Sequence, residues 1–598
     1  MPRRRASSRF PGRSDVPWLV LAVAGAGVLG WGFWGNGAEA PPPAEDLRAA
    51  SEDPSSPTPV ARVPATAGTL PVSPGTVSLD GTAPEAKVAP DRAALCPGCD
   101  IVVITVCSLR RDHVGVYGEH PGLTPALDSL AADGVRFTRA YAASNFTLAS
   151  LAAVLTGRFG SHTGVTGWDK GLTADVPTLP EVLGIYGYRT AAFTVDAPSG
   201  FRPDYGLHRG FQRMEIIPPP RDTPDGRFLQ GDPTPQGATA GPLVGWLGSQ
   251  DTSRPIFAMM HTRTAHYPFV LAPPADGEDP TGIRTLLWEA GRAAPTGAKG
   301  DQAMPGMAGG TAQKGVVSIA GPDPLQVQVR KGGAPAVAAW RQAYAEAVTR
   351  MDLDVKRVLD AIDARGRKDR TIVLVVGDHG ESLDDHGELL HGDAYWDSVV
   401  NVPLLLRVPG LTGRDQVVDA LVSQTDILPT LLDLVGAVPP AGIDGVSMAP
   451  LLTGAKARVR ETTFVEGGVA RQHSDVPRGA VVTAEWTLLR QDRGCADAPG
   501  RDAPRRPGEP ATCLYARSTD ASQATNVARS HPDVVTDLLG RWDAFRAANA
   551  SAAAALTLDP AFVKSLQQNG YAFTPGPAVP AAAGTRARRP SGGGGSAK

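Results

Sequence analysis

Short runs of apolar residues recur along the chain, and each is rich in β-branched side chains. They are Ile101–Val106, Thr190–Val195, Ile256–Met260 and Thr371–Val376. Runs of this length are too short for typical helices, and β-branched residues favour extended backbone. The pattern therefore predicts buried β-strands at these four places.

Apolar residues spaced three and four positions apart alternate with these strands. The clearest stretch runs from Val337 to Ile362 and stops at Gly366, which predicts a helix with one buried face. Further helices are predicted over Thr124–Asp133, from Thr147 onward, over Thr178–Tyr186 and over Ile427–Val435. This alternation indicates an α/β fold, in which a mostly parallel sheet carries helices on both faces and binds ligands at the carboxyl ends of its strands.

Glycine and proline are abundant, at 68 and 55 of 598 residues, but 42% of the residues are hydrophobic and the net charge is −3. These values exclude wholesale disorder, and the near-neutral charge provides no basic field for nucleic acid. Glycine and proline concentrate in residues 41–90, 216–242, 271–335 and 575–598. We therefore expect a linker over 36–95, a loop, a low-complexity insertion over 271–335 and a disordered tail over 575–598.

The N-terminus has the pattern of a membrane-targeting element. Residues 1–15 contain five arginines, and residues 16–35 carry no charge. A helix of that length spans about 30 Å, while Ala38-Glu39-Ala40 offers a cleavage site, so a transmembrane anchor and a signal peptide both remain open. Basic residues ahead of the apolar run place the rest of the chain outside the cytoplasm.

Five cysteines suit an exported protein. Cys495 and Cys513 flank a polar, proline-rich excursion and are expected to close it as a disulfide. Cys96 and Cys99 could pair locally within Cys-Pro-Gly-Cys, which leaves Cys107 alone. A thioredoxin-like role for Cys96 and Cys99 is disfavoured, because that motif should follow a strand and open a helix, whereas here it precedes a strand.

Polar side chains follow three of the predicted strands directly. Cys107 follows the first, His261 and His266 follow another, and a third is followed by Asp378, His379, His386 and His391. Parallel strands present their carboxyl ends at one edge of the sheet, so these residues are expected to gather there. Histidine, cysteine and carboxylate ligands together indicate a metal site.

Thr147 is the candidate nucleophile that would face such a metal. It opens a predicted helix whose apolar residues begin at Leu148. A hydroxyl at a helix N-terminus sits beside free backbone N–H groups that favour an anion. Without the metal-binding residues, a plain N-cap role would be the better interpretation of this threonine.

Taken in order, these residues make the chain resemble the sulfatase family of the alkaline phosphatase superfamily, and within it the branch whose first strand ends in Asp-Thr-Leu-Arg. The similarity runs over about residues 100–571. Its motifs are Cys107-Ser108-Leu109-Arg110, Thr124-Pro125, Leu155-Thr156-Gly157-Arg158, His266-Tyr267-Pro268, Gly377-Asp378-His379-Gly380-Glu381, Asn401-Val402-Pro403, Thr425-Asp426-Ile427 and Asp444-Gly445. The resemblance implies one sulfatase-like domain over 96–574, with a smaller C-terminal α+β part over about 455–574.

The resemblance also implies roles for individual residues. Thr147 occupies the nucleophile position, where main-type sulfatases have a Cys or Ser that becomes formylglycine. Threonine cannot form that aldehyde, so direct attack by a metal-bound threonine alkoxide is implied. Asp378 and His379 match the metal-binding pair, while His391 and His266 match positions that contact the ester or its leaving oxygen. His261, His386 and Arg110 are further expected to contact substrate.

Two positions depart from the family pattern. Cys107 replaces the metal-binding Asp of the first strand, and Leu151 replaces a basic residue four positions after the nucleophile. Thiolate binds zinc well but not calcium or magnesium, so a live site would hold one divalent metal with zinc favoured. Loss of the basic residue removes a stabiliser of transition-state charge, worth several kcal/mol.

Two functions of different classes follow from this site. The first is a metal-dependent hydrolase or transferase that acts on sulfuric or phosphoric esters through a covalent Thr147 intermediate. Its substrate would be a small ester or an envelope polymer, and its oligomeric state is open. The second is a catalytically decayed, envelope-anchored binding protein, for which Cys107 and Leu151 are the indications.

Overall fold

The computed structural model describes most of the predicted catalytic region. The described residues all belong to one compact unit within residues 72–598. They are 77–78, 94–195, 201–217, 239–267, 269, 271–275, 277–292, 324–391, 395–413, 415–467, 478–491, 494–495, 511–548 and 554–555. The predicted basic segment, the anchor or signal peptide and the tail lie outside these residues, as does nearly all of the predicted linker.

A nine-stranded sheet forms the centre of the described fold, in the order β1-β6-β5-β7-β2-β8-β11-β3-β12. Its five neighbouring strands β6, β5, β7, β2 and β8 run parallel, and β11 is antiparallel to both of its neighbours. The strands are β1 (Val77–Ser78), β2 (Asp100–Val106), β3 (Val135–Tyr141), β5 (Arg189–Val195), β6 (Arg213–Ile217), β7 (Ile256–Thr262), β8 (Thr371–Gly377), β11 (Leu404–Arg407) and β12 (Gln416–Ser423). The α/β fold is thereby confirmed.

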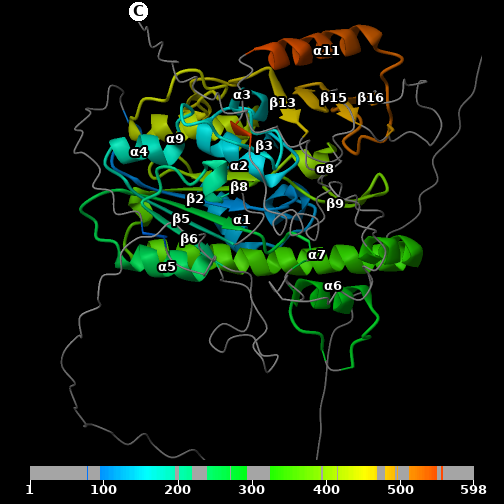
Figure 1. Ribbon diagram of the computed structural model, residues 1–598, viewed down its shortest axis with the longest axis horizontal. Helices are drawn as coiled ribbons and strands as arrows, with labels where there is room; N and C mark the ends of the chain where they lie inside the picture. Colours follow the sequence, from blue (N-terminus) through cyan, green and yellow to red (C-terminus); the bar gives the residue numbers. More distant parts are fainter. Residues whose placement is uncertain are drawn as a thin grey trace, which may run out of the picture. The chain divides into compact units, whose positions relative to one another are not determined.

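Helices cover both faces of this sheet, because its central strands are apolar on both sides. Alternate residues of β2 and β8 pack into two separate cores. One core lies under α2 (Thr147–Thr156), α4 (Leu179–Ile185) and α9 (Ile427–Val435). The other lies under α1 (Pro125–Ala132), α5 (Ala240–Ser249) and α7 (Pro324–Ala364), and the two helical layers stand on opposite sides of the sheet in Figure 1.

The predicted insertion contains more regular structure than its composition suggested. Helix α6 (Ile283–Arg292) lies inside it and buries Leu287 in the second core, and α7 begins at Pro324 rather than near Val337. Gly333 has a left-handed φ of 61° and Pro335 follows, so two helical segments meet at a kink. The Gly-Gly-Ala-Pro sequence hid the first segment from the periodicity, because these residues normally end a helix.

A smaller antiparallel sheet follows the central one in the chain. It has the order β13-β14-β15-β16, and α11 (Pro532–Ala547) packs on it through Leu538 and Trp542. Its strands are β13 (Thr462–Glu466), β14 (Gly479–Thr483), β15 (Trp486–Gln491) and β16 (Ala511–Ala516). The shorter elements are α3 (Gly160–Thr163), β4 (Lys170–Gly171), the hairpin β9 (Ser382–Asp385) and β10 (Glu388–Leu390), α8 (Asp397–Val400), α10 (Ala449–Leu452) and β17 (Ala554–Ala555).

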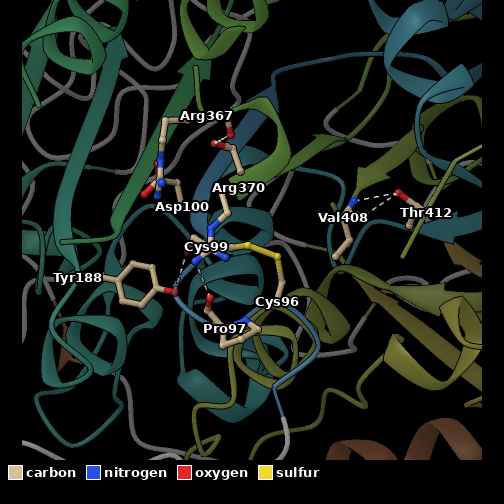
Figure 2. Close-up of a disulfide and its surroundings, with 10 residues drawn as sticks. Cys96, Pro97, Cys99, Asp100, Tyr188, Arg367, Arg370, Val408 and Thr412 are labelled. Atoms are coloured by element: carbon tan, nitrogen blue, oxygen red, sulfur yellow. Dashed lines mark hydrogen bonds and ion pairs between the residues drawn. A yellow bond between two sulfur atoms is a disulfide. The ribbon is translucent and has the colours of Figure 1, made fainter. Parts of the chain in front are cut away.

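Both predicted disulfides are present. Cys96 pairs with Cys99, and Cys495 pairs with Cys513. The first bridge lies at the entry to β2, where Tyr188 donates a hydrogen bond to the Cys99 carbonyl and Arg370 donates one to the Pro97 carbonyl (Figure 2). This bridge therefore secures the start of the strand whose other end carries Cys107.

No helix in the described part of the chain has both the length and the apolarity that a membrane span requires. Residues 16–35 are outside that part, so the anchor and the signal peptide stay predictions.

A histidine links α3 to the C-terminal helix, and this contact predicts a pH dependence. His162 Nδ1 lies 2.7 Å from Asp444 Oδ1, and His162 Nε2 lies 3.1 Å from the Phe545 carbonyl oxygen. Burial lowers the pKa of His162, but the Asp444 carboxylate, the Phe545 carbonyl and the Glu466 charge together raise it above its usual value. We expect the resulting stabilisation to be complete below about pH 6.5 and lost as pH rises through the raised pKa.

Urea unfolding of the wild type and of His162→Gln at pH 6, 7.5 and 9 checks this prediction. The wild type should be the more stable protein at pH 6, and the difference in unfolding free energy should shrink towards pH 9. A difference that grows with pH would contradict it.

Candidate active site

Three parallel strands deliver polar side chains to the same edge of the sheet. In the register of the sheet, Thr105 of β2 is opposite His261 of β7, and Val106 is opposite Gly377 of β8. The residues that follow, Cys107 and Asp378, therefore come out beside His261. The sequence-based expectation that these strand ends converge is confirmed.

Cys107, His261 and Asp378 form a group that could hold a metal ion. One ligand atom from each, the Cys107 sulfur, a His261 nitrogen and an Asp378 oxygen, lies within 4.8 Å of the other two. All three side chains are fully buried. Two buried atoms in them, His261 Nε2 and Asp378 Oδ2, have no hydrogen-bond partner. Burying polar atoms without hydrogen-bond partners costs free energy, and a bound ion would remove that cost. These three ligand groups therefore fit a metal ion.

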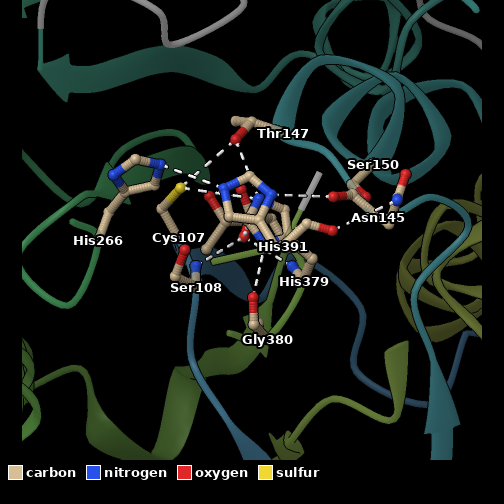
Figure 3. A network of polar contacts seen from close by, with 12 residues as sticks. Cys107, Ser108, Asn145, Thr147, Ser150, His266, His379, Gly380 and His391 are labelled. Carbon is tan, nitrogen blue, oxygen red and sulfur yellow. Dashed lines mark hydrogen bonds and ion pairs between the residues drawn. The ribbon is translucent and has the colours of Figure 1, made fainter. Parts of the chain in front are cut away.

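Thr147 lies against this group as the first residue of α2. Phe146 is the N-cap residue, and no side chain caps the helix. The Thr147 hydroxyl instead lies 3.4 Å from the Cys107 sulfur and 3.3 Å from His379 Nε2 (Figure 3). Since it is fully buried and does not cap its helix, a plain capping role for this threonine is excluded.

Two further histidines lie beside His379. The His379 and His391 rings are 3.9 Å apart, and His391 Nε2 is 3.3 Å from His266 Nε2. His391 Nδ1 lies 3.1 Å from the Asn145 carbonyl, which can only accept, so Nδ1 carries the proton in that hydrogen bond. Figure 3 shows these rings meeting near Thr147. His266 and His391 thus belong to the same buried cluster as His379, which contacts Thr147.

His386 and Arg110 do not join this cluster. The His386 ring stacks on Trp396 at 3.8 Å, and Arg110 pairs with Asp112 and Asp385. Both line a separate cavity of about 510 Å³ that also borders α8 and β16. Their expected contact with substrate therefore stays a prediction.

Burial controls the protonation of the cluster. It raises the pKa of the Cys107 thiol well above its usual value, with the Asp378 charge adding to the effect. Burial also lowers the pKa of His261 and of His379 to about 4 and keeps His266 and His391 well below the usual value. The histidines are therefore neutral near pH 7, so each ring has one nitrogen that can bind a metal or accept a proton.

Sequence reasoning missed Arg263, which lies just beyond β7. Its guanidinium is 3.0 Å from His266 Nδ1, and its charge lowers the pKa of Cys107, His379 and His391. Leu151 is buried in the apolar core. Arg263 thus brings a positive charge next to the histidine cluster from the segment that follows β7, and its only sequence sign was its position between His261 and His266.

Comparison with known proteins relates this chain to sulfatases. The sulfatase family profile matches residues 100–437, and the profile of the C-terminal part of N-sulphoglucosamine sulphohydrolase matches residues 391–494. The chain is 26% identical over 400 residues to a Δ4,5-hexuronate-2-O-sulfatase of Bacteroides thetaiotaomicron, which covers 64% of this chain and 76% of that protein.

Other known proteins are also similar to this chain. An N-acetylglucosamine-6-O-sulfatase of the same bacterium is 24% identical over 382 residues, covering 56% of this chain and 67% of that protein. The fold matches the phosphonate monoester hydrolase of Agrobacterium radiobacter with a TM-score of 0.56 and 20% identity, covering 75% of this chain and 96% of that one. With more than half of its length matched by the family profile, the chain belongs to the sulfatase family of the alkaline phosphatase superfamily.

Proposed function

We propose that this protein is a metal-dependent hydrolase of sulfuric or phosphoric esters that works through a covalent Thr147 ester. The observation that carries the proposal is the position of the Thr147 hydroxyl, 3.4 Å from the Cys107 sulfur and 3.3 Å from His379 Nε2. It belongs to the Asp-Thr-Leu-Arg branch of the family in this proposal, with threonine in place of the formylglycine precursor.

One divalent metal, with zinc favoured, would be held by Asp378, His379 and Cys107. Such an ion lowers the pKa of a nearby hydroxyl and polarises an ester oxygen. The remaining steps belong to the chain's own residues. The Thr147 hydroxyl, which lies 3.3 Å from His379 Nε2, gives its proton to the histidine cluster as the Thr147 oxygen attacks sulfur or phosphorus. The bond to the leaving oxygen breaks, and that oxygen receives the proton back from the histidine cluster through His391 or His266.

Positive charge in the site favours this chemistry. Arg263 can stabilise the negative charge that develops on the non-bridging oxygens, which the family's basic residue at the Leu151 position would otherwise do. Water then releases the sulfate or phosphate from Thr147, and an acceptor alcohol in place of water would make the enzyme a transferase. Small esters or envelope polymers remain the proposed substrates.

The site works outside the cytoplasm in this proposal. Two disulfides are stable in oxidising compartments, and the N-terminal pattern predicts export. A membrane anchor at residues 16–35 would tether the domain, whereas signal cleavage would release it.

A panel of chromogenic esters tests the proposed function. The full chain, loaded with zinc, should cleave at least one of 4-nitrophenyl sulfate, 4-nitrophenyl phosphate and a nitrophenyl phosphonate, and acid-quenched samples should carry a sulfo or phospho group on the Thr147 peptide. The preferred ester identifies the reaction class. If the zinc-loaded chain cleaves none of them and the peptide stays unmodified, the decayed binding protein is the better explanation.

A further inference from the structure

We propose that the cavity of about 510 Å³ beside α8 and β16 is a second binding site, and that it takes an uncharged saccharide. Its volume falls within the range of about 300–1,000 Å³ that is usual for ligand sites. The inference rests on the proposed function, because the saccharide would belong to a polymer that carries the ester. It gives a role to His386 and Arg110, which line this cavity and lie outside the cluster around Thr147.

Both sheets of the described fold contribute to the wall of this cavity. The central sheet provides Thr138 and Arg139 of β3 and Asp419 of β12, and the C-terminal sheet provides Thr487 of β15 and Tyr515 of β16. Helix α8 and the turn of the β9–β10 hairpin also line it. No lining residue in the described part of the chain belongs to the cluster around Thr147, so the cavity is a site of its own.

Four residues of the wall each carry a buried polar atom that has no hydrogen-bond partner. These atoms are Ser398 Oγ, Asn401 Oδ1, Arg139 Nε and Arg517 Nε. Asn401 is the clearest case, since the whole residue is only 6% exposed. Buried polar groups without partners cost free energy in a folded protein, and a partner outside the chain removes that cost. The wall is therefore suited to a ligand that forms hydrogen bonds.

The charges in the wall do not favour an anion. The described wall has six carboxylates and four guanidiniums. Three of the guanidiniums are already paired with carboxylates: Arg110 with Asp112 and Asp385, Arg139 with Asp419, and Arg517 with Asp397. Burial lowers the pKa of His386, so this ring adds no positive charge near pH 7. A sulfate or phosphate group would therefore be repelled from the cavity rather than held in it.

The hydrogen-bonding groups of the wall match hydroxyl groups. A guanidinium only donates hydrogen bonds and a carboxylate only accepts them, and each Arg–Asp pair places the two kinds side by side. A hydroxyl both donates and accepts, so one hydroxyl can bond to both members of a pair. A sulfate oxygen only accepts and an ammonium only donates, so each fits half of such a pair. A ligand with several hydroxyls, as in a saccharide, fits this wall best.

The cavity presents little apolar surface to a lipid or to the side chains of a peptide. Its large apolar residues are Trp396 and Tyr515, which are only 3% and 0% exposed. The exposed ring beside them belongs to His386, which stacks on Trp396 at 3.8 Å. A peptide or lipid is usually held by burying apolar groups, and this wall cannot do so.

The β9–β10 hairpin connects the cavity to the cluster around Thr147. His386 precedes β10 and lines the cavity, whereas His391 follows β10 and its ring lies 3.9 Å from that of His379. Five residues of chain span at most about 18 Å, so the two histidines are no further apart than that. A polymer held in the cavity would thereby raise the effective concentration of its ester near Thr147.

A matched pair of leucine variants tests the site. The full chain is titrated in a calorimeter with maltotriose, cellotriose and triacetylchitotriose, and we expect at least one of them to bind one-to-one. Ala521 is exposed and lines the cavity, so Ala521→Leu should narrow it and lower the affinity about 10-fold or more. Ala524 is exposed in the same loop but does not line the cavity, so Ala524→Leu should bind as the wild type does. If none of the three saccharides binds, or if Ala521→Leu binds as tightly as the wild type, the proposal is wrong.

Asn401→Leu separates binding from stability. Leucine is close to asparagine in size and removes a buried oxygen that has no partner, so the midpoint of urea unfolding should stay the same or rise. The saccharide affinity should nevertheless fall about 10-fold, which is the usual cost of one lost hydrogen bond. A folded Asn401→Leu chain with unchanged affinity would contradict the proposal. This variant keeps the test decisive if Ala521→Leu does not fold.

Sodium sulfate and spermidine test the class of ligand. Neither ion should bind in the cavity, because the first only accepts hydrogen bonds and the second only donates them near pH 7. Binding of either ion that is lost in Ala521→Leu and kept in Ala524→Leu would overturn the assignment to a saccharide.

These titrations separate the saccharide site from the proposed function. A chain that binds a saccharide in this cavity but cleaves no ester would refute the function and leave the site standing. A chain that cleaves esters but binds none of the three saccharides would do the reverse.

Discussion

Replacing Thr147 by alanine is expected to lower ester turnover by on the order of 10⁴-fold or more, because covalent catalysis cannot proceed without the nucleophile. Thr147→Ser should keep much of the activity, since serine retains a hydroxyl at the first position of α2, 3.4 Å from the Cys107 sulfur in the wild type. Initial rates on the preferred nitrophenyl ester, together with the mass of the acid-quenched peptide, measure both effects.

A second buried threonine of the same helix provides the control. Thr156 donates a hydrogen bond to the Ala152 carbonyl at the far end of α2. Thr156→Ala should therefore cost about 1 kcal/mol of stability and leave turnover unchanged. Bound zinc should be equal in all three variants. Full activity in Thr147→Ala with zinc in place would sink the covalent mechanism, whereas equal losses in both alanine variants would point to damage to the helix.

The sequence could predict the central strands and helices of the fold, because the apolar residues of each element follow a clear strand or helix spacing. Helix α9 has the predicted bounds of Ile427–Val435, and the strands after Ile101 and Thr371 lie side by side as β2 and β8. The first turns of α7 could not be predicted, because Gly332, Gly333 and Pro335 interrupt the apolar spacing. Glycine and proline weaken a local pattern even where tertiary packing keeps the backbone helical.

The sequence could predict only those residues of the candidate site whose position is determined by the end of a strand. Cys107, His261 and Asp378 meet because each follows, or ends, a parallel strand at the same edge. His386 follows the same strand as His391 yet leaves the site, because the β9–β10 hairpin turns through left-handed residues, including His386 with a φ of 53°. A turn of this kind depends on backbone conformation that residue spacing does not encode.

The position of Arg263 beside His266 and the contacts of His379 could be found only from side-chain geometry. Residue types alone paired Asp378 with His379, which are neighbours in the chain. In the structure, His261 Nε2 has no hydrogen-bond partner, whereas His379 Nε2 lies 3.3 Å from the Thr147 hydroxyl and 3.6 Å from Asp378 Oδ1. These contacts depend on side-chain rotamers, which residue spacing does not encode.

The largest effect on stability is expected from Asp426, which lies at the start of α9. Its carboxylate is fully buried, pairs with the Arg460 guanidinium through both oxygens and accepts hydrogen bonds from the backbone N–H groups of Ser423 and Val446, each at 2.8 Å. Asp426→Ala leaves a buried guanidinium and two buried donors without partners. Breaking a buried pair in this way costs about 3–5 kcal/mol of unfolding free energy.

An exposed pair elsewhere in the chain isolates the effect of burial. Glu461 lies 2.9 Å from Arg458, and these side chains are 64% and 72% exposed. Glu461→Ala removes the same kind of ion pair from water-screened surroundings and should cost less than about 1 kcal/mol. Urea unfolding of both variants at pH 7.5 measures the difference. Similar small losses of unfolding free energy in both variants would mean that Asp426 contributes no more than a surface ion pair. A large loss in Asp426→Ala alone would show that burial strengthens the Asp426–Arg460 pair. That pair would then be the buried contact that joins the β12–α9 corner to the segment before the C-terminal sheet.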